Sequence, residues 1–256
     1  MNLIHHLKQS KKRFIEDRIC TNPDLAKGNF SSSLINNLTH CSQIQNYLEI
    51  GVQHGKTFEA VRARNKYGVD PSPKFSTKHL GSNMAFYKTT SDDFFSKLNK
   101  NIKFDFAFID GLHTFDQTYR DFKNVLKHLT PDGMILLDDV IPYDSYASSP
   151  HQIHALALRH ESGNSHNAWQ GDVYKLAFLI AETMPFLRIT TFVYPLNAQS
   201  LIYLVDPGAP FSVPETIDPR YSGLGFEEAF QDFTKTSKKL NFQFGWNAQA
   251  TLRKSD

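Results

Sequence analysis

The chain has 256 residues, of which 40% are hydrophobic, and its 28 basic and 26 acidic residues leave a net charge of +2. This length suits one large core with decorations, and the near-neutral charge provides no global field to attract nucleic acid or an anionic membrane. Two cysteines, Cys20 and Cys41, are too few for a disulfide framework. No stretch resembles a signal peptide or a membrane span. We therefore expect a soluble, cytoplasmic protein.

Short apolar runs that end in Asp or Gly alternate with helix-like segments along the first 140 residues. The expected strands are residues 46–50, 67–70, 85–89, 104–110 and 133–139. Such alternation is typical of βαβ units and a parallel sheet. Two later runs, 187–195 and 199–206, predict a hairpin at one edge of that sheet. The predicted fold is α/β, a Rossmann-like doubly wound sheet of about seven strands with the last strand antiparallel.

The segment 114–128 predicts an amphipathic helix, because apolar residues repeat on one face from Phe115 onward. Thr114 and Gln117 have the spacing of a capping box, and Pro131 and Gly133 are expected to stop the helix and turn the chain into the next strand.

Three regions follow from this pattern. We expect an N-terminal helical segment over 1–45, a cofactor-binding domain over 46–206, and a C-terminal arm over 207–256. The arm is too short to bury its own core, so it should pack on the same domain.

The stretch "YLEIGVQHGKTFEAV" predicts a strand, a glycine turn and the start of a helix. Gly51 would let a ligand approach the backbone, and Gly55 would allow close packing at the helix start. Gln53 stands where a dinucleotide-binding turn has its second glycine, which disfavours a pyrophosphate. The carboxylate of Glu49 at the end of the strand suits a ligand that carries an ammonium group. An ordinary tight strand–helix turn is the alternative.

Further acids follow the next two strands. Asp70 lies where an acidic side chain accepts both hydroxyls of a ribose, which indicates a nucleoside-bearing cofactor. In "TTSDDFF", Asp92 or Asp93 would reach an adenine amino group. Alternatively, both acids stabilise the first turn of a helix through its dipole.

Asp110, Asp138 and Asp139 follow two strands that we expect to be neighbours, so their carboxylates should meet at one crevice. Three carboxylates there would raise one another's pKa unless a cation compensates them. Oxygen ligands with room for water suit Mg²⁺ or Mn²⁺. His113 would stand beside such a metal as a general base. Alternatively, the acids cap the following segments and His113 has no catalytic work.

These residues together resemble the class I S-adenosylmethionine-dependent methyltransferases, most strongly over residues 46–140. Within that class the chain looks like the metal-dependent sugar O-methyltransferases of the macrocin and mycinamicin type. The motifs are "ExGxxxG" at Glu49 and "IDGLHTFDQTYRDF", followed by "PDGMILLDD". Catechol-type enzymes look similar at the metal positions but use lysine where His113 stands, which favours the sugar branch.

The resemblance implies a role for each of these positions. Glu49, Gly51 and Gly55 would form the cofactor motif, with Glu49 and Gly51 at the methionine end. Asp70 would hold the ribose and Asp92 would lie near the adenine. Asp110, Asp138 and Asp139 would bind the metal, with Asp110 also in contact with the cofactor and reaction centre. His113 would be the general base.

The resemblance implies less about the residues that follow position 140. "GDVYK" is similar to a late motif of this family, and Asp172 would help to shape the acceptor pocket. His151, His154 and His160 are not explained by the resemblance; a second metal site at His151 and His154 competes with a polar helix face. Tyr143 and Tyr146 would form an acceptor lid or pack in the core.

The expected activity is O-methylation of a sugar or sugar-containing metabolite, with a small-molecule or glycan acceptor, no nucleic acid and no membrane insertion. A homodimer through the N-terminal segment or the C-terminal arm is a further expectation. The alternatives are a nicotinamide (NAD)-dependent oxidoreductase on the same type of sheet, a methyltransferase acting on a small non-sugar metabolite, and a catalytically silent binding module. The sequence does not identify the acceptor.

Overall fold

The computed structural model describes residues 29–39, 43–194 and 197–244. Most of the predicted N-terminal segment lies outside these residues, as does the centre of the predicted hairpin. The only helix described before the sheet is α2 (Phe30–Leu38), which Asn29 caps by accepting from the Ser32 backbone N–H. None of the helices in the described ranges combines the length and hydrophobicity needed to cross a bilayer.

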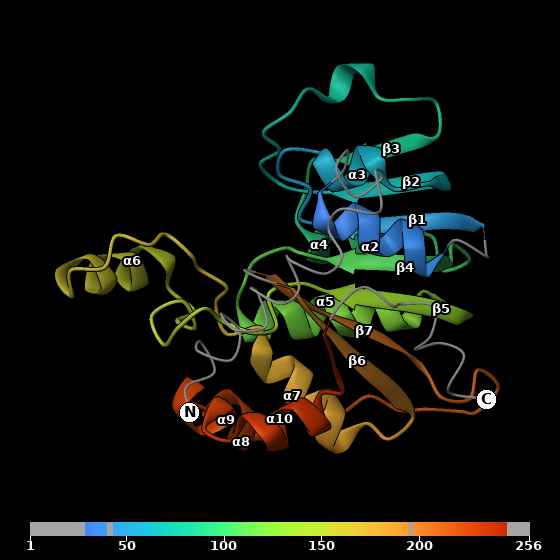
Figure 1. Ribbon diagram of the computed structural model, residues 1–256. Helices are drawn as coiled ribbons and strands as arrows, with labels where there is room; N and C mark the ends of the chain where they lie inside the picture. The colour runs from blue at the N-terminus through green and yellow to red at the C-terminus, as the bar shows by residue number, and fades with distance from the viewer. Residues whose placement is uncertain (1–28, 40–42, 195–196, 245–256) are drawn as a thin grey trace.

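Eight strands form one sheet with the order β3-β2-β1-β4-β5-β7-β6-β8 (Figure 1). The first five are β1 (Ile44–Ile50), β2 (Ala63–Val69), β3 (Met84–Tyr87), β4 (Phe104–Ile109) and β5 (Leu129–Leu137). These five pair in parallel. β7 (Asn197–Leu204) runs antiparallel to both β5 and β6 (Leu187–Tyr194). The predicted Rossmann-like α/β fold is confirmed.

The expected position of the hairpin at the edge of the sheet is wrong. β8 (Phe242–Phe244) pairs in parallel with β6 and forms the edge instead. Three residues are too few to show the alternation by which a strand is recognised in a sequence. The C-terminal arm therefore contributes a strand to the sheet. The division of the chain at residues 45 and 206 stays a prediction.

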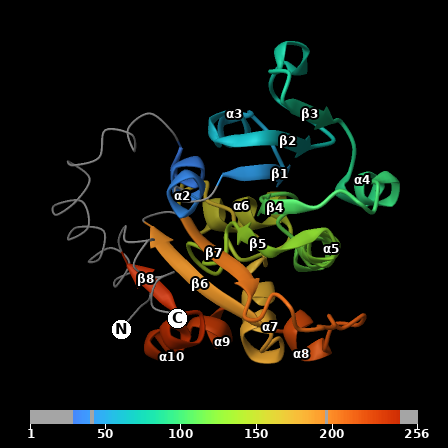
Figure 2. The same cartoon turned by 90° about the vertical axis from the view of Figure 1, so that its right-hand side faces the viewer.

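Helices cover both faces of the sheet (Figure 2). One face is covered by α2 and α3 (Lys56–Ala60), whose apolar side chains form one buried cluster with β1 and β4. The other face is covered by α4 (Ser91–Lys97), α5 (Phe115–Lys127) and α7 (Tyr174–Thr183), which contribute to a second, larger cluster. The remaining helices are η2 (Thr77–His79), α6 (Gln152–Glu161), α8 (Pro219–Ser222), α9 (Phe226–Phe230) and α10 (Phe233–Lys239). Of these, α6 stands out from the body of the molecule (Figure 1).

The predicted helix at 114–128 is confirmed as α5, whose apolar face is buried. The predicted capping box is wrong. The Thr114 side chain caps no described N–H, and the side-chain amide of Gln117 donates to Ser91 and Asp121 instead of reaching back to residue 114. The N–H of Phe115 is capped from a distant segment, by Oδ1 of Asp172 at 2.7 Å.

The predicted turn after α5 is also wrong in detail. The helix ends at Lys127, but Pro131 and Gly133 lie within β5. Leu129 already pairs with Phe104, and the register then shifts before Met134 pairs with Phe106. Pro131 is tolerated because it lies in this irregular part of the ladder.

Candidate active site

The carboxyl ends of β1, β4 and β5 meet at the point where the strand order reverses, because β1 lies between β2 and β4. Ile50 pairs with Ile109, and Ile109 pairs with Leu137. The backbone N–H of Asp110 donates to the Ile50 carbonyl at 2.9 Å, and that of Asp138 donates to the Ile109 carbonyl at 3.1 Å. In open α/β sheets, ligands bind at such a crevice.

Asp110, His113 and Asp139 form a compact cluster at this crevice, with one ligand atom from each within 4.8 Å of the others. Nε2 of His113 lies 3.4 Å from Oδ1 of Asp110, and Nδ1 lies 3.0 Å from Oδ2 of Asp139. Despite that short distance, Nδ1 is buried and makes no hydrogen bond of good geometry with any described residue. The imidazole is thus placed between two carboxylates.

Asp138 is held by other partners. Its Oδ1 accepts from the side-chain amide of Gln199 at 3.0 Å and from the N–H of Asp139 at 2.9 Å. The same amide nitrogen of Gln199 donates to Oγ of Ser31 in α2 at 2.7 Å. Of the three acids that the sequence grouped, the structure brings Asp110 and Asp139 together with His113, and it engages Asp138 with β7.

The charges in the cluster are unfavourable as they stand. Burial raises the pKa of Asp110 well above its usual range, and the nearby carboxyls of Asp138 and Asp70 add to this effect. Burial and Asp138 likewise raise the pKa of Asp139, while His113 opposes the rise. A divalent cation would favour the ionised carboxylates, and the carboxylates of Asp110 and Asp139 are suitable oxygen ligands for it. The residues present therefore fit a metal.

Glu49 lies near the end of β1 and is 1% exposed. Its carboxylate accepts from the Tyr47 hydroxyl at 2.5 Å. Among the described residues no lysine, arginine or histidine forms an ion pair with it, and Nζ of Lys66 donates to the Phe58 and Glu59 carbonyls instead. Burial raises the pKa of Glu49 well above its usual range. A buried carboxyl without a cationic partner fits a ligand that brings an ammonium group.

The glycine turn after β1 is shaped by the protein's own backbone. Gly51 has φ +84°, and a Cβ atom there would lie 1.9 Å from the carbonyl oxygen of Asp110. Only glycine allows the ends of β1 and β4 to approach this closely. Gly55 precedes α3 with φ +77°, and a Cβ there would lie 3.0 Å from the ring of Phe75. Gly55 thus permits the close packing predicted for it.

Asp70 follows β2 and holds the same turn. Its Oδ2 accepts from the N–H groups of Val52 at 3.0 Å and Gln53 at 2.8 Å, and its Oδ1 accepts from Ser72 at 2.7 Å. From the described residues Oδ1 accepts only this one bond, and it has further acceptor capacity. The carboxylate is therefore in position to organise the turn, whether or not it also contacts a ligand.

Asp92 and Asp93 occupy the first turn of α4, where acids favour the helix dipole. Both are exposed, and Asp92 pairs with Arg120 at 3.3 Å. His151, His154 and His160 are exposed as well. Within the described ranges, the cluster at Asp110 is the one group of three or more possible metal ligands, and these histidines form none.

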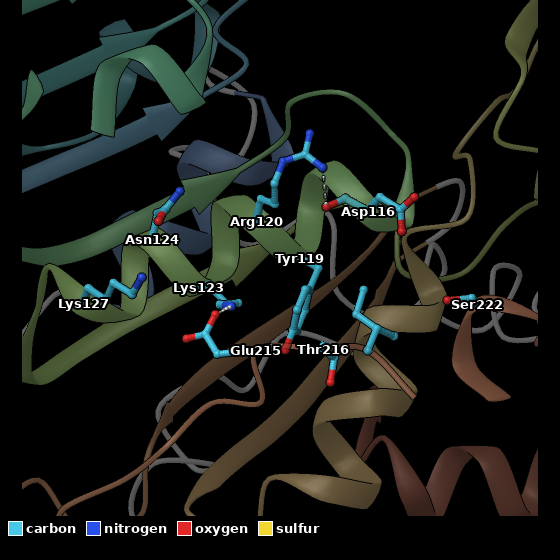
Figure 3. Close-up of a pocket in the computed structure, with 10 residues that line it drawn as sticks. Asp116, Tyr119, Arg120, Lys123, Asn124, Lys127, Glu215, Thr216 and Ser222 are labelled. Atoms are coloured by element: carbon cyan, nitrogen blue, oxygen red, sulfur yellow. Dashed lines mark hydrogen bonds and ion pairs between the residues drawn. The ribbon is translucent and has the colours of Figure 1, made fainter. Parts of the chain in front are cut away.

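A cavity of about 590 Å³ lies beside α5 (Figure 3). It is bounded by Tyr119, Arg120 and Lys123 and by the segment from Glu215 to Ile217. Lys123 is paired with Glu215 at 2.5 Å across its wall. Because none of the predicted site residues lines this cavity, we do not assign it to the reaction.

Two neighbours of His113 were not predicted from the sequence: Trp169 stacks on its ring, and Gly171 lies against its backbone. Asp172, which was expected to help shape the acceptor pocket, caps the start of α5. No local pattern marks Trp169, because its partner is distant in the sequence.

Residues 48–140 match the family model described as "Methyltransferase domain". These residues run from β1 to just beyond β5 and contain every residue of the predicted site. The match favours methyl transfer over the nicotinamide-dependent alternative. A comparison with curated proteins found no match.

Several solved structures are similar in part. The O-methyltransferase TomG from Streptomyces achromogenes, in complex with SAM, is 15% identical with a TM-score of 0.49, over 78% of this chain and 88% of that one. An O-methyltransferase from Bacillus cereus in complex with SAH is 17% identical with a TM-score of 0.45, over 78% and 90%. A putative O-methyltransferase from Klebsiella pneumoniae is 14% identical with a TM-score of 0.46, over 78% and 89%. These likenesses are too low to carry an argument about cofactor or acceptor.

The sheet order, the crevice and the family match agree with one another. Residues 48–140 of this chain match a methyltransferase domain, and this match supports the methyltransferase activity predicted from the sequence.

Proposed function

We propose that this protein is a divalent-metal-dependent O-methyltransferase that methylates a hydroxyl of a sugar or sugar-containing metabolite, with S-adenosylmethionine as methyl donor. The observation that carries the proposal is the convergence of Asp110, His113 and Asp139 at the crevice where β1 also ends. These residues place two carboxylates that would hold a cation beside an imidazole that would accept a proton. All three lie within residues 48–140, which match the methyltransferase model.

On the cofactor side, Glu49 would accept hydrogen bonds from the methionine ammonium group, which would supply the positive charge that its buried carboxylate lacks. Asp70 would bind the ribose through its remaining acceptor capacity while it holds the turn at Val52 and Gln53. Asp92 lies at the start of α4 and would border the adenine. These roles follow from the resemblance described above.

On the acceptor side, Asp110 and Asp139 would hold the metal, and Asp138 would support Asp139 by accepting its backbone N–H. When bound, Mg²⁺ or Mn²⁺ lowers the pKa of a coordinated hydroxyl, and S-adenosylmethionine supplies the methyl group. His113 would take the hydroxyl proton on a ring nitrogen, which would leave the acceptor oxygen ready to receive the methyl group. The carboxylates then keep the resulting imidazolium in place.

The choice of a sugar rests on His113 standing where catechol-type enzymes have lysine, and a small non-sugar metabolite is the alternative acceptor. Cytoplasmic location and a homodimer stay predictions.

The test begins with calorimetric titration of S-adenosylhomocysteine, with NAD in parallel, into metal-stripped protein. Saturable binding of the first alone is expected, and binding of NAD alone would overturn the cofactor assignment. Labelled S-adenosylmethionine is then incubated with a panel of glycosides, nucleotide sugars, catechols and small non-sugar alcohols, with Mg²⁺ or with EDTA. Methylation of glycosides that EDTA abolishes supports the proposal.

Asp110→Ala should remove nearly all turnover while leaving S-adenosylhomocysteine affinity largely intact. The matched control is Asp132→Ala, an exposed acid near the start of β5, which should leave turnover unchanged. Strong turnover by Asp110→Ala that ignores EDTA would refute the metal assignment.

A further inference from the structure

Trp169 forms a flat wall against His113. The two ring centroids lie 4.9 Å apart with an interplanar angle of 17°, a stacked arrangement. The indole is itself fixed, because its Nε1 donates to the Ser149 carbonyl at 2.7 Å. The nitrogens of the His113 imidazole face Asp110 and Asp139, so the stacking limits rotation of the ring away from these partners.

The backbone of His113 is held by the same segment. Gly171 has φ +65°, and a Cβ atom there would lie 1.7 Å from the carbonyl oxygen of His113. The N–H of Asp172 donates to that oxygen at 3.2 Å. A residue with a side chain at position 171 would therefore push the two segments apart.

Asp172 also fixes the helix that follows His113. Its Oδ1 caps the N–H of Phe115 at 2.7 Å, and its Oδ2 lies 3.0 Å from Nζ of Lys175. The carboxylate is buried, so water competes little for these contacts. The segment 169–172 thus contacts the ring of His113, its carbonyl group and the start of α5.

We propose that Trp169 is a positioning residue, which holds the His113 imidazole in one orientation between Asp110 and Asp139. The segment 169–172 is anchored in turn to the chain beyond β5, because the N–H groups of Gln170 and Gly171 donate to the Ala147 carbonyl at 3.0 and 2.9 Å. A base held in one orientation reduces the loss of orientational freedom on the way to the transition state. This consequence rests on the proposed function, whereas the positioning itself does not.

Proton NMR of the histidine ring signals tests the positioning, with His113→Gln to assign the His113 signals. Protons stacked over an indole are shifted upfield by its ring current, so the His113 signals should lie upfield of those of the exposed His151, His154 and His160. Trp169→Leu should abolish the upfield shift, and Trp169→Phe should retain part of it. His113 signals that are unshifted in the unmodified protein, or unchanged in Trp169→Leu, would overturn the proposal.

The matched control is Tyr143→Leu, which removes another stacked pair in the same region, between Tyr143 and His166 with centroids 4.3 Å apart. It should leave the His113 signals in place. If it shifts them as far as Trp169→Leu does, the effect is a general loosening of the region and the specific role of Trp169 is refuted.

A second measurement leaves Trp169 intact, so it does not depend on the folding of a Trp169 variant. The chain has 2 tryptophans, and Trp246→Phe makes Trp169 the only one. Contact with imidazole quenches indole emission, so adding His113→Gln should raise the fluorescence, and unchanged fluorescence would contradict the contact. Neither measurement uses methyl transfer, so failure of the proposed function would leave both readouts valid.

Discussion

Replacing Gly51 by alanine tests how the ends of β1 and β4 are brought together. Two costs are expected. The left-handed backbone at φ +84° costs a residue with a side chain about 1–2 kcal/mol. The new Cβ, 1.9 Å from the Asp110 carbonyl oxygen, also forces the strand ends apart. That movement weakens the hydrogen bonds at this end, such as Gly51 N–H to Val69 at 2.9 Å, each worth about 1 kcal/mol.

The sum is about 3 kcal/mol, which for a chain of this size lowers the melting temperature by roughly 6–12 °C. Urea unfolding followed by circular dichroism measures the free energy directly. Gly163→Ala is the matched control, because Gly163 has φ +80° but no described heavy atom within 4 Å of a built Cβ. It should show only the backbone cost of about 1–2 kcal/mol.

The displacement should also reach the site, since Asp110 moves with its carbonyl group. Mn²⁺ affinity, measured from the electron paramagnetic resonance signal of the free ion, should fall in Gly51→Ala and stay unchanged in Gly163→Ala. Equal unfolding free energies for the two variants would show that the close approach of β1 and β4 carries no cost, and this would refute the reasoning.

Three further substitutions address charge. His113→Ala should lower turnover by about 10²–10⁴ while S-adenosylhomocysteine affinity is kept, and calorimetry with steady-state rates checks both; unchanged turnover would mean that another group is the base. Glu49→Gln should weaken S-adenosylhomocysteine binding by about 10- to 100-fold, because a charge-assisted hydrogen bond is lost, and unaltered affinity would remove Glu49 from the cofactor site. Asp121 is buried beside Ser91, and burial raises its pKa to about 6. Its protonation favours the folded state, so this contribution is present below about pH 4 and is lost as pH rises to about 6, roughly 3 kcal/mol in all. Asp121→Asn should flatten the pH dependence of the urea unfolding free energy over this range, and an unchanged slope would contradict the raised pKa.

The parts of the fold that depend on local patterns were predictable. In β4, residues 106–109 are apolar and buried without interruption because both faces of the sheet are covered, and α5 has a clear buried face. The missed features depend on distant contacts. The cap of α5 comes from Asp172, 57 residues away from Phe115, and β8 is a strand through its pairing with β6. Likewise, nothing near Trp169 in the sequence indicates that it stacks on His113.

The directions of the Asp138 and Asp139 side chains also depend on distant contacts and could not be predicted from the sequence. Adjacent residues in an extended chain point to opposite faces, so the sequence alone could not decide which carboxylate joins Asp110. Gln199 on β7 fixes the Asp138 side chain, because its amide donates to Oδ1 of Asp138 at 3.0 Å. The other acid takes a left-handed conformation at φ +58°, and its carboxylate meets His113.

Asp138 can therefore serve the site without direct contact with the reacting groups. Its Oδ1 accepts the N–H of Asp139 at 2.9 Å, which stabilises the bend that turns the Asp139 side chain toward His113. Leucine or alanine at 138 would lose this support and also leave the Gln199 amide without one of its acceptors. Asparagine could still accept at the same position with little change in shape. Asp138→Asn should then retain most Mn²⁺ affinity where Asp139→Asn loses it, and an equal loss in both would show that Asp138 binds the metal directly.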